Sequence, residues 1–337
     1  MKTRRVKAVA LFSGGLDSTL AILVMKSHGV EVEAIKFLTH FGCDANNSSS
    51  CGSDPSLAAN QFGFPVRLCH LGQKFIDMVK KPQFGYGKNM NPCIDCRILM
   101  LREAKDYLEM TDADFIITGE VLAQRPMSQM RGTLNLIDRE SSLGGRLLRP
   151  LSGKLLPPTK PEMDGLIQRD WLLDISGRSR RRQIDLAAEF GLTGYPNPAG
   201  GCLLTEKAYS KKLRDLFTFV EEPGFDDFNL LKVGRHFRLA HDCRLVIGRN
   251  QPENQILLKN IRPGDRVLEA VNIASPIGLL RGNPLQKNIE LAAAITARYS
   301  DARQQPKATV KIKGDGAPEQ LLEVSPASNE ILEKYRI

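Results

Sequence analysis

A short segment near the start of the chain, Ser13-Gly-Gly-Leu-Asp-Ser-Thr19, limits what this chain can fold into more than any other feature. Before it, residues 6–10 are an apolar run of strand length. After it, residues 20–28 have a helical composition that stops at Gly29. The sequence therefore predicts a strand, a Gly-Gly turn and a helix that begins near Asp17. Because a helix start has unpaired N–H groups and the positive end of a dipole, we expect the turn to bind phosphate.

The composition of this turn supports a phosphate site, although not one of the two commonest phosphate motifs. Its glycines let the backbone approach a ligand closely and its hydroxyls add donors; these residues are Ser13, Gly14, Gly15, Ser18 and Thr19. No lysine follows the glycines as the Walker pattern requires, and the turn does not match the dinucleotide pattern G-x-G-x-x-G. A phosphate enzyme of another class is indicated.

The run Ser13-Gly-Gly-Leu-Asp-Ser18 resembles the SGGxDS signature of the PP-loop family, the N-type ATP pyrophosphatases. The resemblance implies an enzyme that breaks ATP between the α and β phosphates and transfers AMP to an oxygen. It implies that residues 13–19 bind ATP and that Asp17 holds magnesium against the pyrophosphate. The simpler interpretation is a Gly-Gly turn in which Asp17 only caps the helix.

Strand patterns alternate with helix patterns up to about residue 215. Further strands are predicted at residues 32–37, 65–68, 115–118 and 146–149, and helices at residues 54–62, 97–110 and 180–190. This alternation predicts an α/β fold with a doubly wound parallel sheet, whose ligands bind at the carboxyl ends of the strands. The element Thr118-Gly119-Glu120 resembles the family's second nucleotide-facing turn. Gly119 and Glu120 are therefore expected to bind the nucleotide, with Gln124 and Arg125 in the loop behind them.

Three cysteines on Pro- or Gly-containing segments indicate sulfur or metal chemistry. Cys93 and Cys96 form a C-x-x-C pair at the start of a predicted helix, where thiolates are favoured, and Cys202 follows a Gly-Gly pair much later in the chain. The pair by itself is compatible with a redox pair, a zinc half-site or an iron–sulfur half-site. No second C-x-x-C or H-x-x-x-H supplies a fourth zinc ligand, whereas three cysteines suit a [4Fe–4S] cluster with one open iron. A structural zinc or buried thiols without a catalytic role remain the alternatives.

The SGGxDS turn, the Pro-Cys-x-x-Cys helix start and the Gly-Gly-Cys loop together resemble the three-part pattern of the tRNA-thiolating PP-loop enzymes. The match covers roughly residues 1–215. It implies an ATP-dependent tRNA uridine sulfurtransferase: a uracil carbonyl oxygen is adenylated, pyrophosphate leaves, and sulfur then replaces the oxygen as AMP is released. Cys93, Cys96 and Cys202 would be catalytic beside Asp17, and would either ligate a [4Fe–4S] cluster or relay a persulfide.

The other cysteines and the histidines are interpreted as structural. Cys43 and Cys51 flank a polar loop and are interpreted as ordinary loop thiols, with sulfur exchange with the centre as the alternative. Cys69 and Cys243 lie in apolar surroundings and are expected to be packed core thiols. His70 is expected to make a structural hydrogen bond.

A basic run precedes the helix predicted at residues 180–190. Its arginines are Arg178, Arg180, Arg181 and Arg182. Positive charges at a helix start oppose the helix dipole, so helix stability does not explain them, whereas contact with RNA phosphates would. A solvated basic turn is the alternative.

The C-terminal part of the chain has a pattern of its own. Residues 231–239 and 243–254 alternate apolar with basic side chains, as strands with one charged face do. Val-Gly-Arg-His followed by Ile-Gly-Arg-Asn-x-x-Glu-Asn resembles the RNA-binding region of NFACT-type proteins over about residues 225–335. The resemblance implies that RNA is bound by Arg235, His236, Arg249, Asn250 and Asn254. The alternative is a small α+β domain with an ordinary charged surface.

Composition predicts a cytoplasmic enzyme of two domains. The chain of 337 residues suffices for a PP-loop domain at residues 1–218 and a smaller α+β domain at residues 225–337, with a linker at residues 221–225. No apolar run has the length of a membrane span and the start of the chain has no signal-peptide pattern, so we expect no membrane partner. Seven cysteines without a regular framework favour a reducing compartment.

The net charge of +9 permits a polyanionic partner, which we expect to be tRNA, with sulfide or a sulfur-donor protein as the second partner. Three other functions are compatible with parts of the sequence. They are adenylation of a small metabolite, RNA binding without catalysis, and removal of sulfur from thiouracil without ATP.

Overall fold

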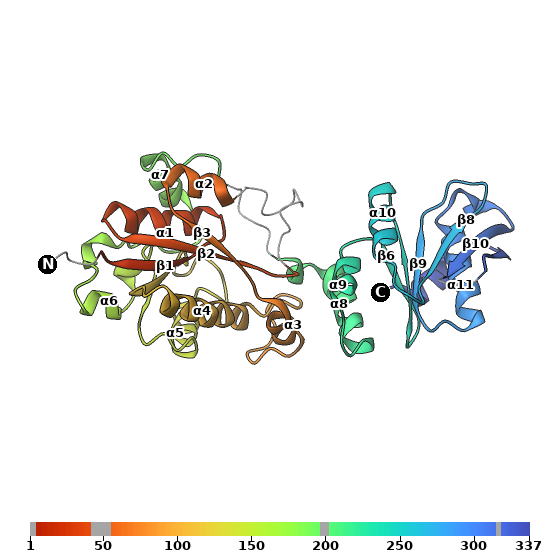
Figure 1. Ribbon diagram of the computed structural model, residues 1–337, viewed down its shortest axis with the longest axis horizontal. Helices are drawn as coiled ribbons and strands as arrows, with labels where there is room; N and C mark the ends of the chain where they lie inside the picture. Colours follow the sequence, from red (N-terminus) through yellow and green to blue (C-terminus); the bar gives the residue numbers. More distant parts are fainter. Residues whose placement is uncertain (1–4, 42–54, 196–201, 315–317) are drawn as a thin grey trace. The chain divides into compact units, whose positions relative to one another are not determined.

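The computed structural model describes residues 5–41, 55–195, 202–314 and 318–337 (Figure 1). Its contacts divide the chain into two compact units, Met1–Thr205 and Glu206–Ile337. In these four described stretches, no helix is both long and apolar enough to cross a membrane.

The first unit is built on a five-stranded sheet in which every pair of neighbours is parallel. The strands stand in the order β3-β2-β1-β4-β5 and comprise β1 Lys7–Leu11, β2 Glu31–Leu38, β3 Val66–His70, β4 Phe115–Thr118 and β5 Leu147–Leu148. The predicted doubly wound parallel sheet is confirmed. The strand order reverses between β1 and β4, and ligands of such sheets bind at the carboxyl ends of the strands at this point.

Helices cover both faces of this sheet (Figure 1). They are α1 Leu16–Ser27, α2 Pro55–Phe62, α3 Gly72–Lys80, α4 Cys93–Met110, α5 Arg131–Glu140, α6 Lys160–Met163 and α7 Arg181–Glu189, with 3₁₀ turns at Gly153–Leu155, Arg169–Trp171 and Leu203–Thr205. Because side chains alternate along a strand, Ala8 and Ala10 of β1 belong to a core with α1, α2 and α7. Val9 and Leu11 belong to a second core with α4 and α5. Both faces therefore hold β1 and the loop after it in place.

The second unit contains a six-stranded antiparallel sheet. Its order is β11-β10-β8-β9-β7-β6, and the strands are β6 Arg235–Ala240, β7 Cys243–Ile247, β8 Arg266–Ala270, β9 Gly278–Gly282, β10 Ala308–Gly314 and β11 Gln320–Val324. The predicted second, smaller α+β domain is confirmed as a fold.

Helices also pack on both faces of this second sheet. They are α8 Lys207–Phe219, α9 Phe225–Leu231, α10 Gln251–Lys259, α11 Gln286–Arg298 and α12 Asn329–Tyr335, with a 3₁₀ turn at Asp301–Gln304. One core joins the sheet to α11 and α12, and another joins it to α9 and α10. By its contacts α8 lies with this unit, whereas the sequence placed the domain limit after it, at residue 218.

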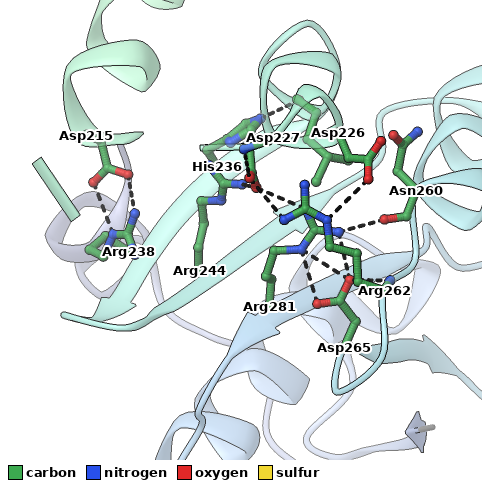
Figure 2. Close-up of polar contacts among 12 residues, drawn as sticks. Asp215, Asp226, Asp227, His236, Arg238, Arg244, Asn260, Arg262, Asp265 and Arg281 are labelled. Atoms are coloured by element: carbon green, nitrogen blue, oxygen red, sulfur yellow. Dashed lines mark hydrogen bonds and ion pairs between the residues drawn. The ribbon is translucent and has the colours of Figure 1, made fainter. Parts of the chain in front are cut away.

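A network of buried charges ties α9 to the sheet (Figure 2). Asp227 of α9 accepts hydrogen bonds from Arg244 of β7 (3.2 Å), from Arg281 of β9 (3.0 Å) and from Arg262 in the turn before β8 (3.0 Å). Asp265 binds Arg281 again through both carboxylate oxygens. Burial alone would raise the pKa of Asp227, but the three guanidinium groups hold this pKa below its ordinary value. The carboxylate therefore stays charged and joins one helix to two strands.

Lys212 of α8 is a partly buried cation in the same unit. Its Nζ donates to the carbonyl oxygens of Leu231 (3.1 Å) and Gly234 (3.3 Å). Burial, reinforced by the nearby Arg249, lowers the pKa of Lys212 to about 8. The folded chain therefore loses this proton at a lower pH than the unfolded chain does.

This difference predicts how stability depends on pH. Between pH 8 and the ordinary lysine value of 10.5, the unfolded chain binds more protons at Lys212 than the folded chain does. The contribution of Lys212 to the free energy of unfolding therefore rises with pH across this window. In urea unfolding of the second unit, we expect the wild-type chain to gain stability relative to Lys212→Met between pH 7 and pH 10. A difference that is constant over this range would contradict the prediction.

Candidate functional site

The Gly-Gly turn after β1 has the geometry of an anion-binding loop. Gly14 has a φ of 78°, which favours glycine, and α1 begins after Gly15 as its N-cap. The first N–H groups of α1 have no partner within the helix. The hydroxyls of Ser18 and Thr19 donate to the carbonyl oxygen of Gly15 (2.9 and 3.1 Å), and Thr19 is fully buried. This corrects the expectation for Thr19, because its buried hydroxyl binds the backbone of the loop itself.

Asp17 does not cap the helix. The N-cap residue is Gly15, and no side chain makes a capping hydrogen bond at this helix start. Oδ2 of Asp17 accepts from Nε2 of Gln124 (2.7 Å), whereas Oδ1 is buried and has no partner among the residues that the structure describes. A buried carboxylate oxygen without a donor is unusual, and it suits a hard cation such as Mg²⁺. The capping interpretation of Asp17 is therefore wrong, and a metal-binding interpretation fits the geometry.

Gly119, at the end of β4, lies directly against the start of α1. A Cβ at this position would lie 2.4 Å from the backbone nitrogen of Ser18 and 2.5 Å from the carbonyl carbon of Asp17. Both are backbone atoms, which cannot rotate away as a side chain does. The contact therefore places the end of β4 against the loop that follows β1.

This contact predicts a sharp difference between two glycines. Gly119→Ala should push β4 away from α1, lower the free energy of unfolding by about 1–3 kcal/mol and weaken ATP binding. Gly132→Ala is the control, because a Cβ there meets nothing within 4 Å and Gly132 lies in α5. It should stabilise the chain by about 0.5–1 kcal/mol. Urea unfolding and ATP titration measure both effects, and equal behaviour of the two variants would contradict the assignment.

Glu120 has a different role from the one predicted. Its carboxylate is almost fully buried and binds Arg97 of α4 (3.0 Å) and Arg149 after β5 (2.9 Å). Arg149 also binds both carboxylate oxygens of Asp138. Burial would raise the pKa of Glu120, but Arg97 and Arg149 hold it below its ordinary value. Both oxygens are used inside the protein, so Glu120 positions the turn instead of contacting the nucleotide directly.

Backbone contacts bring the two cysteine segments together. Asp95 in the first turn of α4 accepts from the backbone N–H of Gln83 (2.7 Å) and so holds the loop that precedes Cys93. Further along this loop, the N–H of Met90 donates to the carbonyl of Leu204 (3.1 Å). Leu204 lies two positions after Cys202. The three predicted thiols, Cys93, Cys96 and Cys202, thus belong to one region at the start of α4.

The thiols are not anionic, which corrects the prediction from the helix start. Burial raises the pKa of Cys96 to about 12 and that of Cys202 to about 11, and it also raises the pKa of Cys93. Each thiol is close enough to another for its charge to contribute to these shifts. Among the described residues, no three His, Cys, Asp or Glu side chains are arranged to hold a metal ion. The donor chemistry suits an iron–sulfur cluster, but this arrangement of the thiols does not fit one.

The other cysteines have the following positions. Cys243 is fully buried in the core that contains α11, as predicted. Cys69 of β3 is partly exposed beside the core that contains α4, and burial raises its pKa. Nδ1 of His70 accepts from the N–H of Gly72 (3.0 Å), in agreement with a structural role. Cys43 and Cys51 lie outside the described residues.

The basic run before α7 is linked to the loop that follows Glu120. The N–H of Gly177 donates to the carbonyl of Leu122 (2.8 Å). Gln183 of α7 is fully buried, and its Nε2 donates to Oε1 of Gln124 (2.9 Å), the residue that binds Asp17. A chain of side-chain amides therefore joins Asp17 to α7.

The four arginines of this run are not equivalent. Arg178 and Arg181 are exposed, and Arg182 binds Asp174 (2.6 Å). Arg180 is partly buried, and its Nε has no partner in the described part of the chain. Arg178 and Arg181 are the arginines of this run best placed to meet an external phosphate.

The residues predicted for RNA binding in the second unit also differ from one another. The guanidinium of Arg235 lies over the ring of Tyr299 (4.6 Å). Arg249 is half exposed and binds Glu253 (2.6 Å). Asn250 is exposed and caps α10 by accepting from the N–H of Glu253 (3.0 Å). These three positions leave surface for a ligand.

Two members of the predicted RNA-binding set are corrected by the structure. His236 is only 1% exposed, and its Nε2 contacts the carbonyl oxygens of Val233 (2.8 Å) and Leu230 (3.1 Å). Burial, with Lys212 nearby, lowers its pKa well below the ordinary value, so the ring stays neutral. Oδ1 of Asn254 accepts from the N–H of Ile277 (3.1 Å). Both side chains bind the protein's own backbone, and the buried ring of His236 is not accessible to RNA.

Arg97 and Gln183 also lie at this site, although neither was predicted from the sequence as a site residue. Arg97 follows Cys96 directly, and this adjacency was the one signal that could have singled it out. Gln183 has no local signal at all, because its importance comes from a partner in another part of the chain, Gln124.

Two family models match the chain, and each falls within one unit. The model described as "Thiamine biosynthesis protein (ThiI)" matches residues 4–154. The model described as "NFACT protein RNA binding domain" matches residues 234–336. The chain joins a ThiI/PP-loop thiolase-like domain to an NFACT-like RNA-binding domain.

Similar proteins resemble this chain at low identity. The tRNA-specific 2-thiouridylase MnmA of Staphylococcus carnosus (strain TM300) is 20% identical, over 90% of this chain and 85% of its own length. MnmA of Salinibacter ruber (strain DSM 13855 / M31) is 23% identical, over 89% of this chain and 83% of its own. A solved 4-thiouridine synthetase–RNA complex with bound ATP is 24% identical, covers 57% of this chain and 54% of its own, and gives a TM-score of 0.34. The two MnmA proteins are thus distant relatives of this chain, and both are named as tRNA-specific 2-thiouridylases.

Proposed function

We propose that the chain is an ATP-dependent tRNA uridine sulfurtransferase that releases pyrophosphate and AMP. The observation that carries the proposal is a direct structural link between the phosphate loop and the thiols. Gly119 contacts the backbone of Asp17, and the next residue, Glu120, binds Arg97, which follows Cys96. The named activities of the MnmA relatives support the same reaction class.

Activation would take place on the loop at residues 13–19. The N–H groups of the first turn of α1 face the phosphates, and Asp17 would hold the magnesium ion that neutralises the pyrophosphate as it leaves. A uracil carbonyl oxygen attacks the α-phosphorus, so that AMP becomes attached to the base. This step is needed because a ring oxygen is a poor leaving group, whereas AMP is a good one. The protein contributes positioning and charge neutralisation.

Sulfur transfer follows at the adenylated ring carbon. A hydrosulfide anion attacks this carbon and a C–S bond forms. The C–O bond to AMP breaks, its electron pair leaves with the AMP phosphate, and the S–H proton goes to solvent. No oxidant or reductant is consumed when hydrosulfide is the sulfur source.

Cys93, Cys96 and Cys202 would deliver the sulfur. A [4Fe–4S] cluster would require these three thiols to move from the positions described; if bound, it would be held by them and would supply iron that binds hydrosulfide, whereas a persulfide relay would use the thiols directly. Because their pKa values are raised, the thiols of Cys96 and Cys202 are protonated at neutral pH. They would bind a sulfur species only after a partner or a metal ion has removed these protons.

The second unit, together with the arginines before α7, would bind tRNA. We expect Arg235→Gln and Arg249→Gln each to weaken tRNA binding several-fold and to reduce the salt dependence by about one phosphate contact. Arg303→Gln is the control, because Arg303 is exposed in the same unit and lies outside the predicted set. Filter binding at several salt concentrations measures the effect. Equal slopes for all three variants would assign RNA binding to other residues.

The full reaction is tested with anaerobically purified chain, unmodified tRNA, ATP, magnesium and sulfide. The expected result is ATP-dependent thiouridine in the digested tRNA, detected by mass spectrometry, with one AMP released for each sulfur incorporated. AMP formation with a small metabolite and no tRNA would favour the metabolite alternative. No pyrophosphate release under any condition would overturn the proposal.

A further inference from the structure

Arg97 is an arginine held at one end only. Its Nε contacts Oε1 of Glu120 (3.0 Å), and the carboxylate of Glu120 is almost fully buried. The other oxygen of Glu120 binds Arg149, which is held in turn by Asp138 through two hydrogen bonds. The anchor of Arg97 is therefore a fixed, internally satisfied ion chain.

The rest of the guanidinium is not used by the protein. No hydrogen bond joins its two terminal amino groups to another described residue, and the side chain is 31% exposed. Arg149 is shared between Glu120 and Asp138, so Arg97 balances the second carboxylate of this ion chain, and it does so through its Nε alone. A guanidinium fixed by its Nε with its terminal groups free has the form of a receptor for a second anion.

Arg97 is linked both to the loop that contains Asp17 and to the cysteine segment. On one side, Glu120 follows Gly119, which packs on the backbone of Asp17. On the other side, its charge acts on Cys93 and Cys96 and lowers the pKa of both thiols against the effect of burial. Arg125 also acts on Cys93 in this way, from the loop that contains Gln124. Positive charge thus gathers between the phosphate loop and the thiols.

We propose that Arg97 binds the phosphate of the adenylated tRNA and holds it as AMP departs during sulfur transfer. This inference rests on the proposed function. In the activation step, negative charge develops on pyrophosphate, at the loop and Asp17. In the sulfur step, the C–O bond breaks and its electron pair passes to the AMP phosphate, while hydrosulfide forms the C–S bond and releases its proton to solvent. A planar guanidinium binds such a phosphate through two parallel hydrogen bonds, which an ammonium cannot do.

The test separates the two steps in the full-length protein. With tRNA and without sulfide, ATP–pyrophosphate exchange reports activation. With sulfide added in a single turnover, thiouridine formation and AMP release report sulfur transfer. Arg97→Gln should slow sulfur transfer at least about a hundredfold and leave exchange within about threefold. Arg97→Lys should recover only part of the loss, because it restores the charge without the planar fork.

Arg102→Gln is the matched control, since Arg102 lies on the same helix, is exposed and binds only the backbone carbonyl of Glu140. It should not change either step. If Arg97→Gln lowers exchange and sulfur transfer equally, together with the melting temperature, Arg97 is structural and the inference is overturned. Normal sulfur transfer in Arg97→Gln overturns it as well. If the wild-type protein itself neither exchanges pyrophosphate nor thiolates tRNA, the proposed function fails and this inference with it.

Discussion

Asp17→Asn is expected to reduce ATP-dependent pyrophosphate release by roughly a thousandfold, because a catalytic metal contributes several kcal/mol and each ~1.4 kcal/mol is a factor of ten. The substitution leaves an amide oxygen that can still accept from Gln124, so the fold of the loop should be kept. It replaces the oxygen that is buried without a partner by an uncharged amino group, which cannot bind a metal ion as a carboxylate does. Pyrophosphate release with tRNA, ATP and magnesium measures the effect.

Asp185→Asn provides the control for charge. Asp185 lies exposed on α7, so its replacement should leave pyrophosphate release unchanged. Binding of tRNA should stay within a few-fold in both variants, because Asp17 is not an RNA contact in this proposal. Full activity of Asp17→Asn would remove the metal-binding role and with it the PP-loop mechanism.

Replacement of any one of Cys93, Cys96 and Cys202 by alanine is expected to abolish thiouridine formation while ATP–pyrophosphate exchange continues. The reason is that the phosphate loop and its link through Gly119 do not depend on the thiols. Nucleoside analysis by mass spectrometry and pyrophosphate exchange measure the two activities on the same preparations. Cys69→Ala is the control, because Cys69 is a partly exposed thiol on the edge strand β3 and should leave both activities unchanged.

Iron analysis of the same variants separates the two sulfur mechanisms. If the wild-type chain carries about four irons and each of the three alanine variants loses them, a [4Fe–4S] cluster is present. If iron stays at background while thiouridine forms aerobically, the persulfide relay is favoured. Normal thiolation by all three variants would contradict both mechanisms.

The sequence predicted the strands and the phosphate loop well because these depend on local patterns. The strand at residues 115–118 coincides with β4, and the helix after Gly15 begins at Leu16, close to the predicted start. Alternation of apolar and basic residues at 231–239 and 243–254 also predicted strands, which correspond to β6 and β7, although the end of the second stretch forms the start of α10. α3 and α5 were not predicted, because each carries only a narrow apolar stripe among polar residues.

The errors at the site have a common cause, since each involves a partner far away in the sequence. Glu120 was assigned to the nucleotide because its neighbours resembled a motif, but Arg149 and Arg97 occupy its oxygens. His236 was assigned to RNA because it sits in a basic motif, but the chain folds its ring against the carbonyl of Val233. The raised pKa values of the thiols follow from burial, which no spacing of cysteines reveals. Local pattern identified the segments of the site, whereas tertiary contacts decide what each side chain does.

The backbone contact at Gly119 also determines how this chain can vary. Every missense change in a glycine codon adds at least one carbon atom, and at this position that carbon would overlap the backbone of Ser18 and Asp17. No partner substitution can make room, because the obstructing atoms are common to all amino acids. In a library of all single variants selected for function, position 119 should accept no replacement, while position 132 should accept most. Position 119 is thus expected to stay glycine in any variant of this chain that keeps the fold, whereas position 132 is free to change.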